Sequence, residues 1–314
     1  MKRKKLTIAK YVADIALIIV LSFMYYLNKP IHSPQVLYIP TGSINKIISQ
    51  LQHNNYDVSK LDSLVLRLLG SPQSGWINMQ TRYNTKADFL YKLTRAKAAL
   101  QNIILIPGET TYIFLNQLSQ NLLLSREQLQ KEYNEQSSIQ EGAFVPDTYK
   151  IPIGITEYDI IHILLTHSKN KMKAFSIKIF GSYNQKRWLH YVAIASIIQK
   201  ESANIDEMPL VSSVVHNRLK KKMKLQMDGS LNYGKYSHIK VTPKRIREDK
   251  SIYNTYKNKG VPNIPVCNVS FDAIRAAIFP KKTEYLYFMK SKKGTHDFSR
   301  YYSTHLSNIR RATK

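Results

Sequence analysis

The sequence predicts an α+β protein with an N-terminal transmembrane helix, a small α+β module and a larger mixed α+β domain. Three observations support this class: an apolar segment follows a basic N-terminus, short strand and helix patterns alternate over residues 35–100, and helical patterns separated by Gly- and Pro-containing loops fill the rest. With 314 residues, 43% of them apolar, the chain is long enough for two domains with packed cores. We place the divisions at residues 1–30, 31–100 and 101–314.

Composition narrows the possible partners and cofactors. Lys and Arg outnumber Asp and Glu by 47 to 21, a net charge of +26 that raises nucleic acid, anionic lipid or another acidic polymer as a partner. Basic residues are mostly scattered singly and no nucleic-acid-binding motif accompanies them, so we expect no nucleic-acid role. The single cysteine, Cys267, excludes an internal disulfide and a Cys-based metal cluster. No HExxH or paired Cys/His spacing is present, and we expect neither a metal nor a cofactor.

The N-terminal segment predicts a membrane anchor. Residues 6–27 follow a basic cluster at 2–5 and approach the roughly 20 residues that span a bilayer. The positive flank should stay in the cytoplasm, which places the residues after Asn28 outside it. A cleaved signal peptide is the alternative, because Lys10 and Asp14 shorten the strictly apolar part. No small-residue cleavage site follows, so we favour an uncleaved single-pass anchor.

The small module is predicted to run strand, helix, helix, strand, helix after an extended, Pro-flanked linker at 30–34. Gly70 would end the second helix, and Thr85 is a plausible N-cap of the third. On these residues alone the favoured interpretation of the module is a spacer without chemistry.

One glutamate of the larger domain stands out as a candidate catalytic acid. Glu201 lies on the same helical face as three isoleucines, Ile194, Ile197 and Ile198. A carboxyl group on a core-facing surface loses hydration, which raises its pKa and lets it hold a proton near neutral pH. The alternative is a structural role, in which Glu201 reaches water or pairs with Arg218 on the following helix.

Polar and aromatic residues after this glutamate form a candidate sugar-binding set. Aromatic rings pack against sugar faces, while amide, carboxylate and hydroxyl groups hydrogen-bond to sugar substituents. Each tyrosine alone is more often a packing residue, because the chain contains 21 of them. The candidates are Asn217, Gln226, Asp228, Tyr233, Tyr253, Asn254 and Tyr256.

Several ordered segments together resemble one known family, the endolytic murein transglycosylases or YceG-like proteins. They are "IASIIQKES", "PLVSSVVHNRL", "MKLQMDGSLNYG", "SIYNTYKNKGVP", "EYLYFMK" and "THDFSRYYSTH". "EGAFVPDTY" resembles another family segment, and residues 35–100, with "IPTGS" and "GWINM", resemble the family's LysM-like domain. The resemblance implies a protein of the bacterial cytoplasmic (inner) membrane, with its C-terminal part periplasmic. Its implied partners are peptidoglycan glycan strands and penicillin-binding protein synthases.

The resemblance also implies a reaction. Family members cleave the β-1,4 bond between N-acetylmuramic acid and N-acetylglucosamine inside nascent glycan strands, leave 1,6-anhydro ends and thereby terminate strand growth. Glu201 matches the second glutamate of the family's E-K-E-T string, which is the implied acid, whereas Gln199 replaces the first. In the family's L-Q-T-D-P segment, Met227 replaces the threonine and Gly229 the proline. Gln226, Asn217 and Tyr256 are our candidates for holding the acetamido groups and stabilising positive charge.

Two other functions stay open at this stage. If the Asp228 carboxylate faced Glu201, the pair could form a muramidase-type hydrolase that releases reducing sugars. Alternatively, the chain could be an anchored glycan-binding scaffold for wall synthases, and a scaffold would keep its function without the Glu201 carboxyl.

Overall fold

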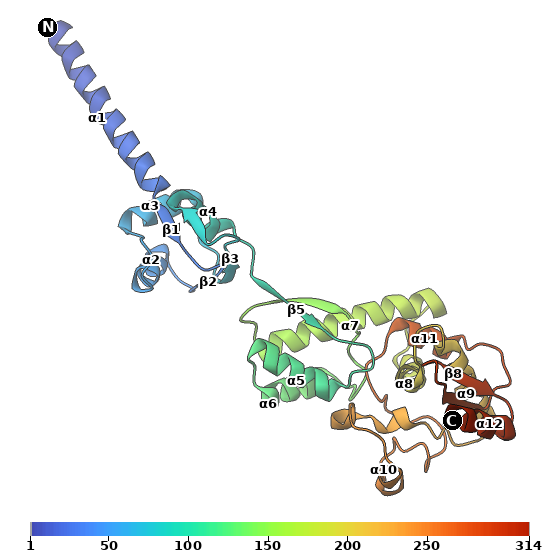
Figure 1. Ribbon diagram of the computed structural model, residues 1–314. Helices are drawn as coiled ribbons and strands as arrows, with labels where there is room; N and C mark the ends of the chain where they lie inside the picture. Colours follow the sequence, from blue (N-terminus) through green and yellow to red (C-terminus); the bar gives the residue numbers. More distant parts are fainter. Residues whose placement is uncertain (1, 314) are drawn as a thin grey trace. The chain divides into compact units, whose positions relative to one another are not determined.

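The computed structural model describes residues 2–313 and divides the chain into two compact units. Unit 1 comprises residues 1–101 and 151–154, and unit 2 comprises residues 102–150 and 155–314. Helices and short strands are both present, which confirms the predicted mixed α+β class (Figure 1).

The N-terminal helix α1 (Lys2–Asn28) carries the apolar segment. Its stretch Thr7–Asn28 has a mean hydropathy of 1.9 and is long and apolar enough to cross a membrane. At 1.5 Å per residue these 22 residues extend about 33 Å, close to the roughly 30 Å of a bilayer's hydrocarbon core. None of the apolar side chains along this stretch is buried by the rest of the protein.

The rest of unit 1 is a small α+β module in which two antiparallel strand pairs pack with three helices around one core. Strand β1 pairs with β4, and β2 pairs with β3. The core is formed by buried aliphatic and aromatic side chains such as Ile39, Leu66 and Phe89. The elements are β1 (Pro30–His32), β2 (Val36–Ile39), α2 (Ile44–His53), α3 (Lys60–Leu69), β3 (Gly75–Asn78), β4 (Tyr83–Thr85) and α4 (Lys86–Arg95).

The structure confirms two predicted helix ends in the module, but the predicted start of the module is wrong. Thr85 caps α4 by accepting a 3.1 Å hydrogen bond from the Asp88 N–H, and Gly70 follows α3, as predicted. The expected linker at 30–34 instead begins with β1, because Ile31 is buried in the module core and Pro30 pairs with Thr85. A proline is compatible with this position because it is the first residue of a strand.

A buried charge cluster joins the end of α1 to the module. The Tyr26 hydroxyl donates a 2.8 Å hydrogen bond to Asp62 Oδ2. Lys86 Nζ lies 3.7 Å from the same oxygen and 4.2 Å from the centre of the Tyr26 ring. Burial alone would lower the pKa of Lys86, but the Tyr26 hydroxyl and the carboxylates of Asp62 and Asp57 raise it, so Lys86 stays charged.

Unit 2 is mainly helical. Strands β5 and β6 form a two-stranded sheet, and β7 pairs antiparallel with β8. The elements from residue 100 onward are β5 (Leu100–Ile104), α5 (Thr111–Leu122), α6 (Arg126–Gln136), β6 (Thr148–Pro152), α7 (Glu157–Phe180), α8 (Gln185–Glu201), α9 (Met208–Lys220), the 3₁₀ turns η1 (Asp228–Leu231) and η2 (Gly234–Tyr236), α10 (Pro243–Glu248), α11 (Phe271–Ile278), β7 (Tyr287–Lys290), β8 (His296–Ser299) and α12 (Tyr302–Thr313).

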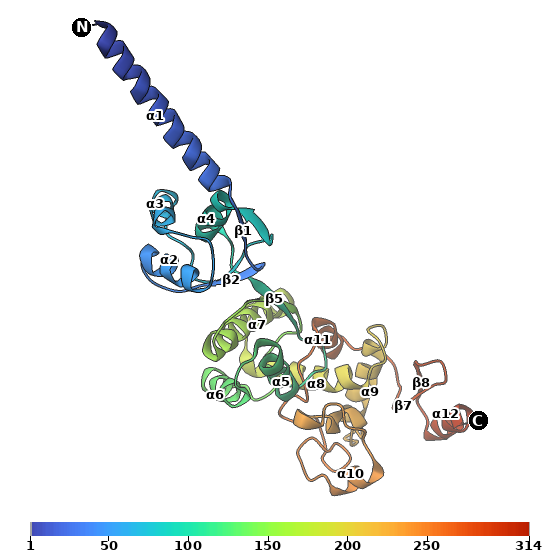
Figure 2. The ribbon, with the colours of Figure 1, turned by 60° about the vertical axis from the view of Figure 1, so that its left-hand side comes forward.

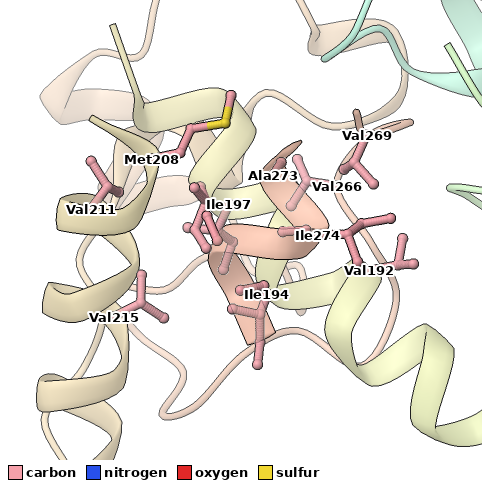
Figure 3. Packing of buried hydrophobic residues seen from close by; sticks show 14 of the residues in the cluster. Val192, Ile194, Ile197, Met208, Val211, Val215, Val266, Val269, Ala273 and Ile274 are labelled. Atoms are coloured by element: carbon pink, nitrogen blue, oxygen red, sulfur yellow. The ribbon is translucent and has the colours of Figure 1, made fainter. Parts of the chain in front are cut away.

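Helix α8 forms the centre of unit 2. In Figure 2 it lies beside α9 and α11, and Figure 3 shows the side chains that fill the space between them. Every residue from Val192 to Ile198 is buried, including Ile194, Ile197 and Ile198 of the predicted apolar face. Burial of α8 therefore continues to within one turn of its last residue, Glu201.

We predict that Lys86→Met destabilises unit 1 by about 3–5 kcal/mol, because Asp62 is fully buried and would lose its cation. The measurement is hydrogen exchange of the full chain in detergent over a urea series, read by mass spectrometry on peptides from α3 and α4. Lys97→Met, which removes an exposed lysine from the same unit, is the control. Equal stability of the two variants would contradict this account.

Candidate active site

Glu201 is the last residue of α8, and its side chain is half-buried. Its Oε1 atom accepts a 2.6 Å hydrogen bond from the N–H of Gly229 in η1. A Cβ on Gly229 would stand 2.6 Å from Lys200 Cβ and 2.8 Å from Glu201 Oε1, closer than real contacts allow. Only glycine lets η1 approach this closely, so Gly229 both makes room for the carboxylate and binds it.

Each of the last three residues of α8 holds a different loop. Gln199 Oε1 accepts hydrogen bonds from the Ser270 N–H at 3.2 Å and the Ser270 hydroxyl at 2.8 Å, at the start of α11. Lys200 Nζ donates a 2.8 Å hydrogen bond to the Ser237 hydroxyl. Together with the bond from Glu201 to Gly229, these contacts gather three remote segments around the end of one buried helix.

The surroundings of Glu201 raise its pKa to about 7. Burial is the largest cause, and the negative charge of Asp228 acts in the same direction. The hydrogen bond from Gly229 and the positive charge of Arg218 favour the carboxylate and oppose the rise. Because the resulting pKa is close to neutral pH, both protonation states are populated there, and Glu201 can both release and accept a proton.

Two loop segments are joined beside this carboxyl group by Thr255, whose side chain is buried. Its hydroxyl accepts a 3.0 Å hydrogen bond from the Met227 N–H, and its carbonyl accepts one from the Gln226 N–H at 3.2 Å. The Tyr256 hydroxyl then donates a 2.7 Å hydrogen bond to Asp228 Oδ1. Gln226, Asp228 and Tyr256 are thus brought together, and all three side chains keep contact with solvent.

Tyr233 and Tyr253 meet in an aromatic stack, with ring centres 4.3 Å apart and planes inclined by 17°. The Tyr233 hydroxyl donates a 3.0 Å hydrogen bond to Asp249 Oδ2. Burial raises the pKa of Tyr253 to about 12, with the charge of Glu141 adding to the effect. Both residues are half-buried, so each combines packing with some exposure to solvent.

Asn217 and Arg218 bind backbone carbonyl groups of neighbouring segments. The Asn217 amide donates 2.9 Å hydrogen bonds to the carbonyls of Thr283 and Tyr285. Arg218 donates to the carbonyls of Leu286 and Leu225, and it affects Glu201 through its charge. Asn217 and Thr283 also line an open surface pocket, or hollow, of about 440 Å³.

The structure corrects one predicted substrate contact. Asn254 is completely buried, and its side-chain amide donates hydrogen bonds of 2.9 Å and 2.8 Å to the carbonyls of Ile246 and Asp249. Its side-chain oxygen accepts a 3.1 Å hydrogen bond from the Tyr256 N–H. Asn254 therefore shapes the loop that presents Tyr256 and cannot touch a substrate in this conformation.

Another carboxyl group with a raised pKa, that of the buried Glu141, was not singled out from the sequence. It accepts hydrogen bonds from the N–H and the hydroxyl of Thr111 and from the Gly142 N–H. Burial raises its pKa to about 7, against the effect of these bonds and of the nearby Lys200 charge. The sequence feature that could have indicated its burial is its position directly before the apolar residues 142–145. Within residues 2–313, no three His, Cys, Asp or Glu side chains are grouped to hold a metal ion.

The sequence of this chain is similar to those of known proteins. The profile of the YceG-like family matches residues 37–311. An endolytic murein transglycosylase of Bacillus subtilis (strain 168) is 31% identical over 166 residues, which are 52% of this chain and 46% of that protein. One from Streptococcus pneumoniae serotype 2 (strain D39 / NCTC 7466) is 30% identical over 154 residues, 48% of this chain and 28% of that protein. The matches thus span less than half the length of these curated relatives.

A solved structure supports the fold. The crystal structure of a YceG-like protein from Listeria monocytogenes superposes with a TM-score of 0.55 at 23% sequence identity. The match covers 89% of this chain and 99% of that one, so the likeness extends over both units.

We predict that Gly229→Ala destabilises unit 2 by about 1–3 kcal/mol, because the new methyl group forces η1 away from α8. The measurement is urea unfolding followed by Trp188 fluorescence in a Trp76→Phe background. Asn170→Ala, which changes an exposed side chain of α7, is the control. Unchanged stability of Gly229→Ala would show that the close approach is not required.

Proposed function

The chain belongs to the YceG-like family, and from this membership we propose that it is an endolytic peptidoglycan lytic transglycosylase. Its substrate would be the β-1,4 bond between N-acetylmuramic acid and N-acetylglucosamine within a glycan strand. The observation that carries the proposal is the carboxyl group of Glu201, which is partly buried, solvent-accessible and balanced between its two protonation states near pH 7.

In the proposed first step, protonated Glu201 donates its proton to the glycosidic oxygen as the bond from this oxygen to the muramyl C1 atom breaks. The N-acetylglucosamine part leaves with a neutral hydroxyl group. Below a pH of about 7 most molecules hold the required proton, because the pKa of Glu201 is raised to that value. Since Gly229 binds Oε1, the other carboxyl oxygen, Oε2, is the one available to the substrate.

In the second step, the Glu201 carboxylate takes the proton from the C6 hydroxyl group of the same muramyl residue. The C6 oxygen then bonds to C1, which closes the 1,6-anhydro ring and restores protonated Glu201 without water. An internal hydroxyl held next to C1 has a high effective concentration, so water competes poorly. The hydrogen bond from Gly229 and the charge of Arg218 would stabilise the carboxylate between the steps.

We assign substrate binding to the solvent-accessible groups near Glu201. Gln226 and Tyr256 would contact the acetamido groups, while Asp228 would stabilise the positive charge that develops at C1. Tyr233 and Tyr253 would offer ring edges to more distant sugars. Asn217 remains a proposed contact through the hollow that it borders, whereas Asn254 is assigned a positioning role.

A muramidase-type hydrolase is the second candidate, and the position of Asp228 is the observation that favours it. Its negative charge reaches Glu201 strongly enough to raise the pKa of that carboxyl group, as in a two-carboxylate site. However, the hydrogen bond from Tyr256 occupies one oxygen of Asp228 and makes it less available as a base or nucleophile. We therefore place the transglycosylase first and treat a non-catalytic scaffold as the third possibility.

The setting of this reaction is also part of the proposal. We propose that α1 anchors the chain in the bacterial cytoplasmic membrane with the residues after Asn28 on the periplasmic side, in agreement with the basic residues at 2–5. The anchored enzyme would cut nascent strands close to where penicillin-binding synthases make them, and so terminate their growth. We keep the division at residues 1–30, 31–100 and 101–314, with residues 31–100 as a LysM-like module.

We predict that the full chain in detergent converts peptidoglycan into internal fragments ending in 1,6-anhydromuramic acid, as measured by mass spectrometry. Glu201→Gln should lose this activity by at least about 1,000-fold, because general acid and base catalysis together are removed. Glu248→Gln, which changes an exposed glutamate of α10, is the control and should cut normally.

The other outcomes separate the alternatives. Reducing ends in place of anhydro ends would support the hydrolase, and Asp228→Asn should then abolish cleavage. If Glu201→Gln cut as fast as the unchanged chain, Glu201 would not be the acid. Absence of cleavage by any form, with binding to peptidoglycan retained, would favour the scaffold.

A further inference from the structure

Helix α3 presents three of its leucines to solvent and its one acidic residue, Asp62, to the protein core. Its buried residues are Asp62, Ser63 and Leu66. Its exposed face carries Leu61, Leu64 and Leu68, which are 40%, 54% and 90% exposed. Their spacing of three and four residues places them on one side of the helix, opposite Asp62. The result is a continuous apolar stripe on the surface of unit 1.

Helix α2 shows that this arrangement is particular to α3. Both helices have ten residues and belong to the same unit. Helix α2 buries Ile47, Ile48 and Leu51, and its outer face carries polar residues such as Ser49. An ordinary surface helix of this module thus has a polar outer face, so the stripe on α3 is not a general property of the unit.

The inward-facing side of α3 is bonded to the outer end of α1. The Tyr26 hydroxyl lies 2.8 Å from the hydroxyl of Ser59, the N-cap of α3, and 2.8 Å from Asp62 Oδ2. Lys86 neutralises Asp62 from the other side. These contacts join α3 to the helix that can cross a membrane, and both views show α3 on the side of the module from which α1 leaves (Figures 1 and 2).

We propose that the leucine stripe of α3 lies in the lipid headgroup region of the membrane that α1 enters. Exposed leucines at this level would be covered by the upper parts of the acyl chains. Lys60 and Arg67, at the polar edge of the stripe, would reach anionic headgroups with their long side chains. Unit 1 would thus be held against the bilayer at two places and would not swing freely on a single helix.

This inference rests on the proposed membrane anchoring. Lipid explains the leucine stripe better than a protein partner does. The N-cap of α3, Ser59, is bonded to the end of α1, whose own apolar side chains need the same surroundings. A ten-residue helix is about 15 Å long and can lie along the membrane surface. A second copy of the chain or another protein would explain the exposed leucines, but not why the residues on the opposite face of α3 hold Tyr26.

The test uses the full chain in lipid vesicles with one fluorescent label that responds to water and to nitroxide lipids. Cys267 is buried and burial raises the pKa of its thiol, so a new surface cysteine can be labelled in its presence. Leu68→Cys places the label on the stripe. Ser49→Cys on α2 is the matched control, and Ile18→Cys reports on α1 itself.

We expect nitroxides near the headgroups to quench the label at position 68, and to leave the label at position 49 unchanged. Leu61→Ser with Leu64→Ser should cause loss of this quenching without unfolding the module, because both leucines are exposed. If position 18 is quenched by deep nitroxides and position 68 is not, the stripe proposal fails while the anchor stands. If neither is quenched, the anchor fails as well. Shielding of position 68 from water without quenching by lipid would identify a protein occupant and overturn the proposal.

Discussion

The candidate site of unit 2 depends on the contact between the Glu201 carboxyl group and the Gly229 backbone. A carboxyl group at the end of a helix buried as deeply as α8 would be costly if it had no partner. The 2.6 Å hydrogen bond from Gly229 supplies one at Oε1, and within residues 2–313 no hydrogen bond to Oε2 is present. Burial raises the pKa of this group and the hydrogen bond opposes the rise, so the same contact sets both the position and the proton affinity of Glu201.

This contact depends on the loops being held in place. Gln199 binds the start of α11, Lys200 binds Ser237, and Thr255 joins the segment before η1 to the segment that carries Tyr256. Each bond joins residues far apart in the sequence, so the candidate site forms only when unit 2 is folded. Asn254 belongs to the same framework, because its buried amide closes the loop below Tyr256.

Local patterns predicted the elements better than the contacts between them. The Thr85 cap, the end of α3 at Gly70 and the buried isoleucines of α8 follow from residue preferences and periodicity, which act within a few residues. Strand β1 was missed because its pairing with β4, some 50 residues away, outweighs the local signal of Pro30. Glu201 could be chosen from the sequence, whereas the requirement for Gly229 appears only when η1 meets α8. Asn254 was misjudged because a polar residue in a loop is usually exposed.

The direct test of this account is the ionisation of Glu201 itself. Carbon-13 NMR of the glutamate carboxyl groups, with Glu201→Gln to assign the signal, gives its pKa in the folded full chain. We expect a midpoint at about 7, with the proton held below that pH and lost above it. A midpoint near the ordinary 4.5 would mean that Glu201 is already charged at neutral pH and cannot be the proton donor proposed for bond cleavage.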